Sequence, residues 1–277
     1  TGIAFPVVYA LKIASSVCEG LHYAHERTDA WGNPLHIVHR DVTPENVFVS
    51  FDGTVKILDF GIAKARGQTG ETSVGEIKGK PSYMSPEQAL GKPLDCRSDI
   101  FSLGVALYEW LTGFRLFTGD SEVAVLRSIS EGKIYGPSYF KPDIPPEVEA
   151  VVMRALEKDR DRRYPSAWEM QRALDHLLAE SDFRPSSMHL ANFLKQLFSD
   201  ELEAERTRLT RASETLATDG DPRRGGRALR LLLPALHAQM RDAVAEIVRE
   251  VGEEAGLGGV ECVLVDRHER QAPDDGA

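Results

Sequence analysis

Residues 39–46 read His-Arg-Asp-Val-Thr-Pro-Glu-Asn, and the interpretation of the whole chain starts from this stretch. It is a polar segment between two short apolar runs, 36–38 and 47–50, which predict strands. Inside the segment, the carboxylate of Asp41 and the amide of Asn46 lie close together in sequence. These two side chains are the first candidates for chemistry.

A further apolar run, 55–58, follows 47–50 after Asp52 and Gly53, a pair of residues typical of a tight hairpin turn. The predicted hairpin returns the chain to the polar loop just before Asp59. We therefore expect the Asp59 carboxylate to converge with the two polar side chains of the loop around one space.

These three side chains match the needs of phosphoryl transfer. That reaction requires a carboxylate to orient a hydroxyl and oxygen ligands to hold magnesium on the phosphates. Asp41 fits the first task, and Asn46 and Asp59 fit the second, because Mg²⁺ favours a few protein oxygens and keeps water and phosphate oxygens for its other positions. The pattern predicts a site for phosphates bound together with magnesium.

Two more motifs follow in order, residues 59–61 (Asp-Phe-Gly) and residues 85–87 (Ser-Pro-Glu). In this order and spacing the motifs resemble the signature of protein kinases. Up to about residue 180, the chain resembles the bacterial eukaryotic-like (Hanks-type) protein serine/threonine kinases. The resemblance implies a fold that is α+β as a family. The part present would be the mainly α-helical C-terminal lobe with short β-hairpins at the 39–46 loop, plus extra C-terminal helices.

The resemblance also implies residues that support the loop. Asp99, at the start of a helix, resembles the aspartate that holds the loop backbone, and it also suits a helix N-terminus as a carboxylate. Glu87 and Arg163 resemble the buried ion pair beneath the activation segment. The complete set of implied supporting residues is His39, Phe60, Gly61, Glu87, Asp99 and Arg163.

The resemblance implies ATP and Mg²⁺ as cofactors, with Mn²⁺ as an alternative metal, and it places two residues near the nucleotide. Phe48 occupies the position of the adenine floor, although an ordinary core aromatic on a strand is an equal interpretation. Glu45 occupies a position near the ribose, and it could alternatively favour basic residues near the phosphoacceptor.

The chain departs from the family pattern at two positions. Thr43 stands where serine/threonine kinases carry a lysine, and Lys80 stands where they carry a threonine. Our hypothesis is that Lys80 enters the site from the activation segment and supplies the missing ammonium, while Thr43 completes the hydrogen bond. A lysine acts as a point charge on a flexible stem, so a different backbone origin is feasible. The alternatives are a solvent-facing Lys80 or a degraded site.

Arg40, before the candidate aspartate, marks kinases that order their activation segment around an anion. Glu76 stands where many relatives carry a phosphothreonine, so it is either a built-in anion or a solvated loop residue. The candidate phosphosites are Thr69, Thr72 and Ser73.

Apolar periodicity predicts helices at about 6–27, 98–111, 121–131, 146–157 and 165–179. We expect residues 1–181 to form the kinase lobe and 182–211 an amphipathic helical extension. Residues 212–228 read as a linker. Residues 229–277 read as a helical tail with a disordered end.

Residues 1–38 contain no glycine-rich phosphate loop, so we expect the ATP-gripping N-terminal lobe to be absent from this sequence. Residue 1 is Thr, which suggests a start further upstream. The expected function is a protein serine/threonine kinase whose C-terminal lobe alone is inactive. The alternative is a non-catalytic, pseudokinase-like scaffold.

The composition limits the kinds of partner and of compartment that we expect. A net charge of −10 argues against non-specific nucleic-acid binding. The resemblance to protein kinases implies protein substrates as partners. Three scattered cysteines form neither a disulfide framework nor a metal motif. No apolar run approaches the ~18 residues of a membrane span. We expect a cytoplasmic protein.

Overall fold

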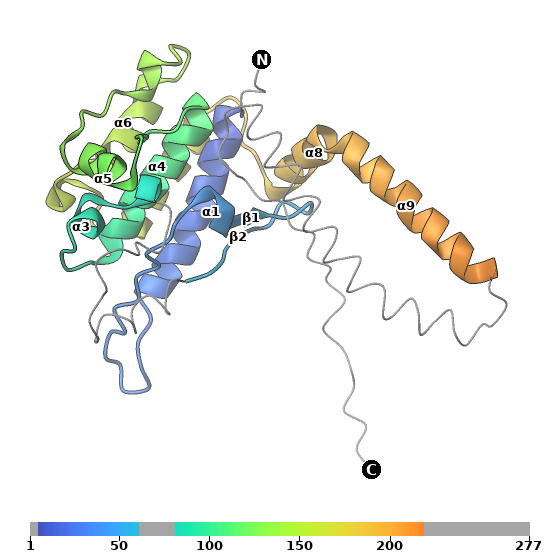
Figure 1. Cartoon of the computed structure of the whole chain (residues 1–277), viewed down its shortest axis with the longest axis horizontal. Helices are drawn as coiled ribbons and strands as arrows, with labels where there is room; N and C mark the ends of the chain where they lie inside the picture. Colours follow the sequence, from blue (N-terminus) through green and yellow to red (C-terminus); the bar gives the residue numbers. More distant parts are fainter. Residues whose placement is uncertain (1–4, 61–80, 219–277) are drawn as a thin grey trace.

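The computed structural model describes residues 5–60 and 81–218. These residues form a mainly helical lobe with one small β-hairpin, followed by two further helices (Figure 1). The predicted fold class is confirmed. The helices of the lobe are α1 (Val7–His25), α3 (Pro86–Ala89), α4 (Cys96–Thr112), α5 (Glu122–Glu131), α6 (Pro146–Ala155) and α7 (Ala167–Glu180).

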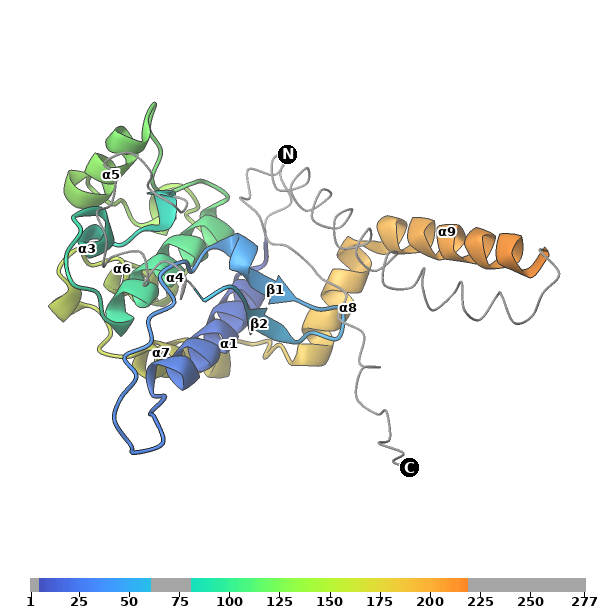
Figure 2. The same ribbon diagram turned by 60° about the horizontal axis from the view of Figure 1, so that its bottom comes forward.

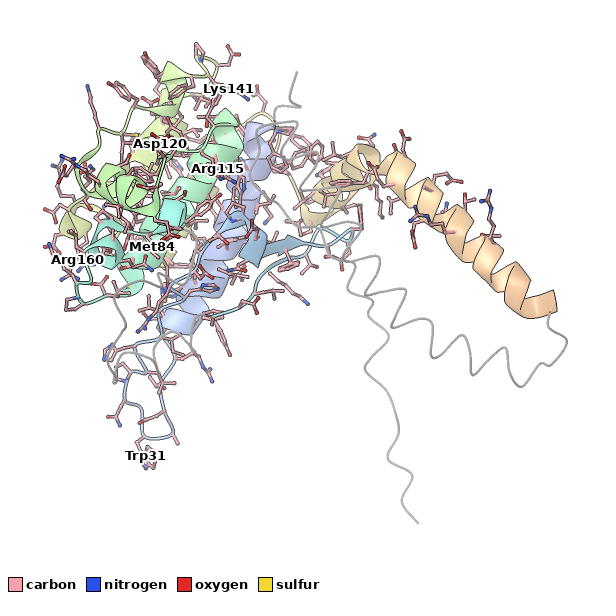
Figure 3. All side chains as sticks on the ribbon, in the orientation of Figure 1. Trp31, Met84, Arg115, Asp120, Lys141 and Arg160 are labelled. Atoms are coloured by element: carbon pink, nitrogen blue, oxygen red, sulfur yellow. The ribbon has the colours of Figure 1, made fainter. Side chains whose placement is uncertain are left out.

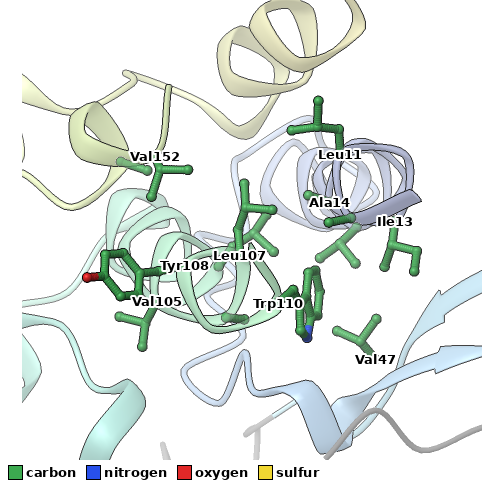
Figure 4. Close-up of a cluster of buried hydrophobic side chains, with 14 of the residues drawn as sticks. Leu11, Ile13, Ala14, Val47, Val105, Leu107, Tyr108, Trp110 and Val152 are labelled. Atoms are coloured by element: carbon green, nitrogen blue, oxygen red, sulfur yellow. The ribbon is translucent and has the colours of Figure 1, made fainter. Parts of the chain in front are cut away.

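Helix α4 is the centre of the lobe. Its side chains from Ser98 to Thr112 are buried on every face, as the apolar sequence predicts. Asp95 caps its first turn by accepting a hydrogen bond from the backbone of Arg97, and Gly113 ends it in the left-handed conformation. Figure 4 shows α4 side chains packed against those of α1 and against Val47 of the hairpin.

The hairpin consists of β1 (Val47–Val49) and β2 (Val55–Ile57), which pair antiparallel. It lies against α1, where the absent side chain of Gly20 allows a close approach: a Cβ there would stand 3.3 Å from Ile57. The turn contains Gly53 at φ +80°, a conformation that glycine adopts at little cost.

The predicted strand at 36–38 is wrong. His36 is exposed and has φ 47°, which breaks an extended chain, and Ile37 and Val38 are only half-buried. Nearby, the only pairing among the described residues is a single bridge between Thr28 and Pro34. A strand needs a partner edge, and this run has none in the described structure.

The other predicted helices of the lobe are present with shifted ends. Helix α7 begins at Ala167 instead of residue 165, because Ser166 accepts a hydrogen bond from the backbone of Glu169 and so caps the helix. Pro146 occupies the first turn of α6, where a missing N–H is tolerated.

Two helices follow the lobe. Helix α8 (Ser187–Leu197) lies beside the hairpin, and α9 (Ser199–Thr218) projects away from the lobe (Figures 1 and 2). Because α9 continues to Thr218, the first residues of the stretch predicted as a linker, 212–228, are helical. Among the described residues, none of the helices combines the length and the apolar composition of a membrane span.

Candidate functional site

The buried carboxylate of Asp99, on α4, holds the start of the 39–46 loop in place. Oδ2 of Asp99 accepts a hydrogen bond from the backbone N–H of His39, and Oδ1 accepts one from Arg40, both at 2.8 Å. The side chain of Asp99 is only 1% exposed, and Oδ2 also lies 2.8 Å from Nε2 of His25 at the end of α1. Charge-assisted hydrogen bonds of this kind are strong, so the start of the loop is fixed to two helices.

The side chain of His39 connects the loop to the segment after the hairpin. Its Nε2 lies 2.8 Å from the carbonyl oxygen of Leu58, and its Nδ1 accepts a hydrogen bond from the backbone N–H of Asp41 at 3.3 Å. These partners fit a neutral ring with the proton on Nε2. The ring also contacts that of Phe60, with centroids 4.4 Å apart.

Asn46 and Asp41 lie side by side. Nδ2 of Asn46 donates to the backbone oxygen of Asp41 at 2.8 Å and to its carboxylate Oδ2 at 3.3 Å. The backbone oxygen of Asn46 accepts from Leu58 at 2.9 Å, which places the residue before Asp59 against the loop. The structure therefore brings the loop and the Asp59 segment together through backbone hydrogen bonds.

Two residues at this site adopt a left-handed backbone that non-glycine residues rarely occupy. Arg40 has φ 68° and Asp59 has φ 58°. Such conformations cost free energy and persist where surrounding contacts enforce them, typically at functional sites. Asp59 is exposed, so its carboxylate is available to a ligand.

The donor set suits magnesium bound together with phosphates. Because Nδ2 of Asn46 is engaged by Asp41, the amide oxygen Oδ1 remains as a ligand, next to the segment that carries the Asp59 carboxylate. Among the described residues, no three His, Cys, Asp or Glu side chains form a metal site of their own. Mg²⁺ commonly uses one or two protein oxygens and takes the rest from water and phosphate.

A second support joins the loop to α3. Nε2 of Gln88 donates to the backbone oxygen of Arg40 at 3.0 Å. Gln88 itself is fixed by a reciprocal capping box with Ser85 at the start of α3. Gln88 thus links the Ser-Pro-Glu motif directly to the 39–46 loop.

Beneath these segments, Arg163 and Glu87 form a buried bidentate ion pair. The two hydrogen bonds measure 2.7 and 2.8 Å, and Ser98 donates a third to Glu87 at 2.7 Å. The Arg163 side chain is fully buried, and its remaining N–H groups donate to backbone oxygens. Burial favours a higher pKa for Glu87, but the hydrogen bonds from Arg163 and Ser98 outweigh it and hold that pKa below its usual value.

The remaining candidates are placed as follows. Thr43 is buried at the start of the short helical turn Pro44–Asn46. Glu45 lies half-buried in that turn, and Phe48 lies half-buried on β1 opposite Lys56. Six predicted residues lie outside the described part of the chain: Gly61, Thr69, Thr72, Ser73, Glu76 and Lys80.

Sequence reasoning missed three participants, namely His25, Gln88 and Ser98. Each contacts a candidate residue through a single hydrogen bond, across 74 residues for His25, 48 for Gln88 and 11 for Ser98. No local motif signals the contacts of His25 and Ser98. The one usable hint was Gln88, which directly follows the Ser-Pro-Glu motif.

The chain is similar to known protein kinases. The sequence model of the protein kinase domain matches residues 3–178. The tyrosine-protein kinase MasK of Myxococcus xanthus is 42% identical over 215 residues, which are 78% of this chain and 33% of MasK. The serine/threonine-protein kinase PknB of Mycolicibacterium smegmatis is 42% identical over 164 residues, which are 58% of this chain and 25% of PknB. This chain thus spans between a quarter and a third of the length of these relatives.

Among solved structures, the kinase domain of Mycobacterium tuberculosis PknI matches with a TM-score of 0.46 and 26% identity, over 63% of this chain and 56% of that one. The match to the domain model covers more than half of the sequence, and it contains every candidate residue of the site. The chain therefore belongs to the protein kinase family.

Proposed function

We propose that this chain supplies the catalytic lobe of a protein kinase that transfers the γ-phosphoryl group of ATP to a hydroxyl group of a protein. The observation that carries the proposal is the 3.3 Å contact between Asn46 and the Asp41 carboxylate, beside the segment that bears Asp59. The three side chains that phosphoryl transfer requires thus come from adjacent backbone segments.

Each residue has a distinct task in this proposal. Asp41 orients the acceptor hydroxyl and accepts its proton. The amide oxygen of Asn46 and the carboxylate of Asp59 would hold magnesium, which neutralises charge on the phosphates when it is bound. Asp99 and His39 touch neither substrate nor metal, and they position the loop through its backbone.

The Lys80 hypothesis remains part of the proposal. The buried Thr43 cannot supply a positive charge, so the ammonium on the γ-phosphate would come from Lys80. The double exchange Thr43→Lys/Lys80→Thr tests this directly. We expect Lys80→Ala to lower phosphotransfer and the double exchange to restore it. Unchanged activity of Lys80→Ala would show that this lysine faces solvent.

We propose serine or threonine as the acceptor. The similarity to PknB supports this, as does the Tyr-Met-Ser-Pro-Glu-Gln run at residues 83–88. Tyrosine is a second candidate, because MasK, named a tyrosine-protein kinase, matches a larger part of the chain. Phosphoamino-acid analysis of a phosphorylated general substrate separates the two outcomes.

The test of the function uses the longest natural polypeptide that contains this chain. We expect it to transfer ³²P from ATP to protein in a magnesium-dependent reaction that Asp41→Asn abolishes. Binding of a partner protein without transfer, unaffected by Asp41→Asn, would favour the scaffold alternative. The 277-residue chain alone is expected to show negligible transfer, because residues 1–38 hold no glycine-rich loop to enclose the phosphates.

A further inference from the structure

Helix α8 packs against the turn of the hairpin and the start of α1. Phe198, just after α8, contacts Phe51 edge to face, with ring centroids 6.0 Å apart. Phe193 stacks on Tyr9 at 4.5 Å and contacts Phe5 at 5.7 Å. Figures 1 and 2 both show α8 at the end of the hairpin. The extension is therefore joined to the lobe by aromatic contacts at two places.

The buried side chains of α8 are part of the same core as the hairpin. Leu190 is completely buried, Leu194 is 2% exposed, and both belong to one hydrophobic cluster with Val47 and Val49 of β1. Burying a leucine side chain stabilises a fold by roughly 1.5–3 kcal/mol, so this contact is strong enough to hold the helix in place.

At the turn the two backbones are in direct contact. A Cβ on Gly53 would lie 1.8 Å from the backbone oxygen of Ser187, the first residue of α8. The turn is itself ordered, because Gly53 donates to the oxygen of Ser50, and Ser50 donates to that of Thr54. Helix α8 therefore begins directly against a hydrogen-bonded turn.

This hairpin is the covalent connection between Asn46 and Asp59. Asn46 immediately precedes β1, and Asp59 follows β2 after one residue. Resting on the proposed function, we propose that α8 is a positioning element for the magnesium ligands: it clamps the hairpin from outside and so fixes the separation of the Asn46 amide and the Asp59 carboxylate.

The similarity to MasK also includes α8. The match to MasK extends over 215 residues. Any stretch of this length within the 277-residue chain contains residues 63–215, and therefore all of α8. The similarity to this relative thus extends over the lobe and the clamping helix together.

The chain offers a matched pair of glycine variants to test the clamp. In Gly53→Ala, the new methyl group would collide with the backbone of Ser187. Gly32 has a similar positive φ, but a methyl group added there would meet no neighbouring atom within 4 Å. Both variants carry the strain of a left-handed alanine, and only the first disturbs α8. We expect amide hydrogen exchange in peptides from the hairpin and α8 to be roughly tenfold faster in Gly53→Ala, and unchanged in Gly32→Ala.

Phe198 provides a second pair. Phe198→Ala removes the contact with Phe51 and should accelerate exchange in the hairpin, while Phe198→Leu should restore most of the protection by refilling the space. Equal hairpin exchange in Gly53→Ala and Gly32→Ala, or no acceleration in Phe198→Ala, would overturn the inference.

The functional consequence is measured on the natural polypeptide that contains this chain. We expect the Mg²⁺ concentration for half-maximal phosphotransfer to rise about tenfold in Phe198→Ala and to return toward normal in Phe198→Leu. An unchanged magnesium requirement despite faster exchange would refute the positioning role. If the unmodified polypeptide transfers no phosphate, the proposed function fails, while hydrogen exchange still decides whether α8 clamps the hairpin.

Discussion

Two polar clusters of this lobe differ in how completely their hydrogen-bonding groups are used. At the Glu87–Arg163 pair, both carboxylate oxygens and the whole guanidinium are paired inside the protein. At the candidate site, hydrogen bonds also fix the backbone of the 39–46 loop, yet the neighbouring Asp59 is exposed. The difference teaches that a saturated polar cluster stabilises the fold, while a fixed cluster with open oxygens is ready to bind a ligand.

The largest expected effect concerns the saturated cluster. Arg163→Met leaves the Glu87 carboxylate buried without its cation, so we expect the free energy of unfolding to fall by about 3–5 kcal/mol. Urea denaturation measures the loss. The control is Arg127→Met, which breaks an exposed pair with Glu131 and should leave the free energy of unfolding nearly unchanged. Equal losses in both variants would remove the distinction between the two clusters.

The open cluster should respond in the opposite way. Asp41→Asn is expected to lower kcat of the natural polypeptide by roughly 10²–10⁴-fold, because the acceptor hydroxyl loses its base. Its thermal unfolding temperature should stay within error of the parent. Asp120→Asn, in an exposed loop, serves as the control for an unrelated carboxylate (Figure 3). A large loss of stability in Asp41→Asn would mean that this residue is structural.

Asp99 resembles the Glu87–Arg163 cluster, because both of its carboxylate oxygens have partners, although it supports the loop of the candidate site. In Asp99→Asn, one acceptor oxygen is replaced by an NH₂ group. In one orientation of the amide this group faces the backbone N–H of Arg40, and in the other it faces the backbone N–H of His39 and the His25 ring. We expect a loss of about 1–3 kcal/mol in the free energy of unfolding. Asp95→Asn, at the N-cap of the same helix, keeps the cap and weakens only the partly exposed pairs with Arg97 and Arg160, so we expect a smaller loss.

The smallest expected effect is a pH dependence. The pKa of Glu87 is lowered in the folded chain, so the ion pair stabilises the fold above the unfolded pKa of about 4.3, and this stabilisation is lost as the pH falls through the lower folded value. Between about pH 5 and pH 3, the free energy of unfolding should therefore fall more steeply in the parent than in Glu87→Gln. Parallel slopes in urea titrations would contradict this.

Much of the fold followed from the sequence because its signals are local. The apolar run of α4, the Asp52-Gly53 turn and the periodicity of α1 each predict an element that the structure contains. The run at 36–38 misled the prediction, because β-favouring residues form a strand only where a neighbouring edge exists.

The site was predictable only as far as its motifs reach. Asp41 and Asn46 stand in one short stretch, and the structure places their side chains in contact. His25 shares the Asp99 carboxylate across a wide separation in sequence, and α8 meets the hairpin through aromatic packing that no motif encodes. Such contacts depend on the three-dimensional arrangement of helices, which local patterns do not specify.

One carboxylate oxygen has a consequence for how this lobe tolerates change. Oδ2 of Asp99 contacts both the His25 side chain, at the end of α1, and the backbone N–H of His39. The residues on either side of the loop 26–38 are therefore held by the same atom. Trp31 marks its protruding tip, 85% exposed (Figure 3). Because lengthening a loop between fixed ends adds little closure entropy, this excursion can accept grafted peptides or labels while the residues that follow keep their places.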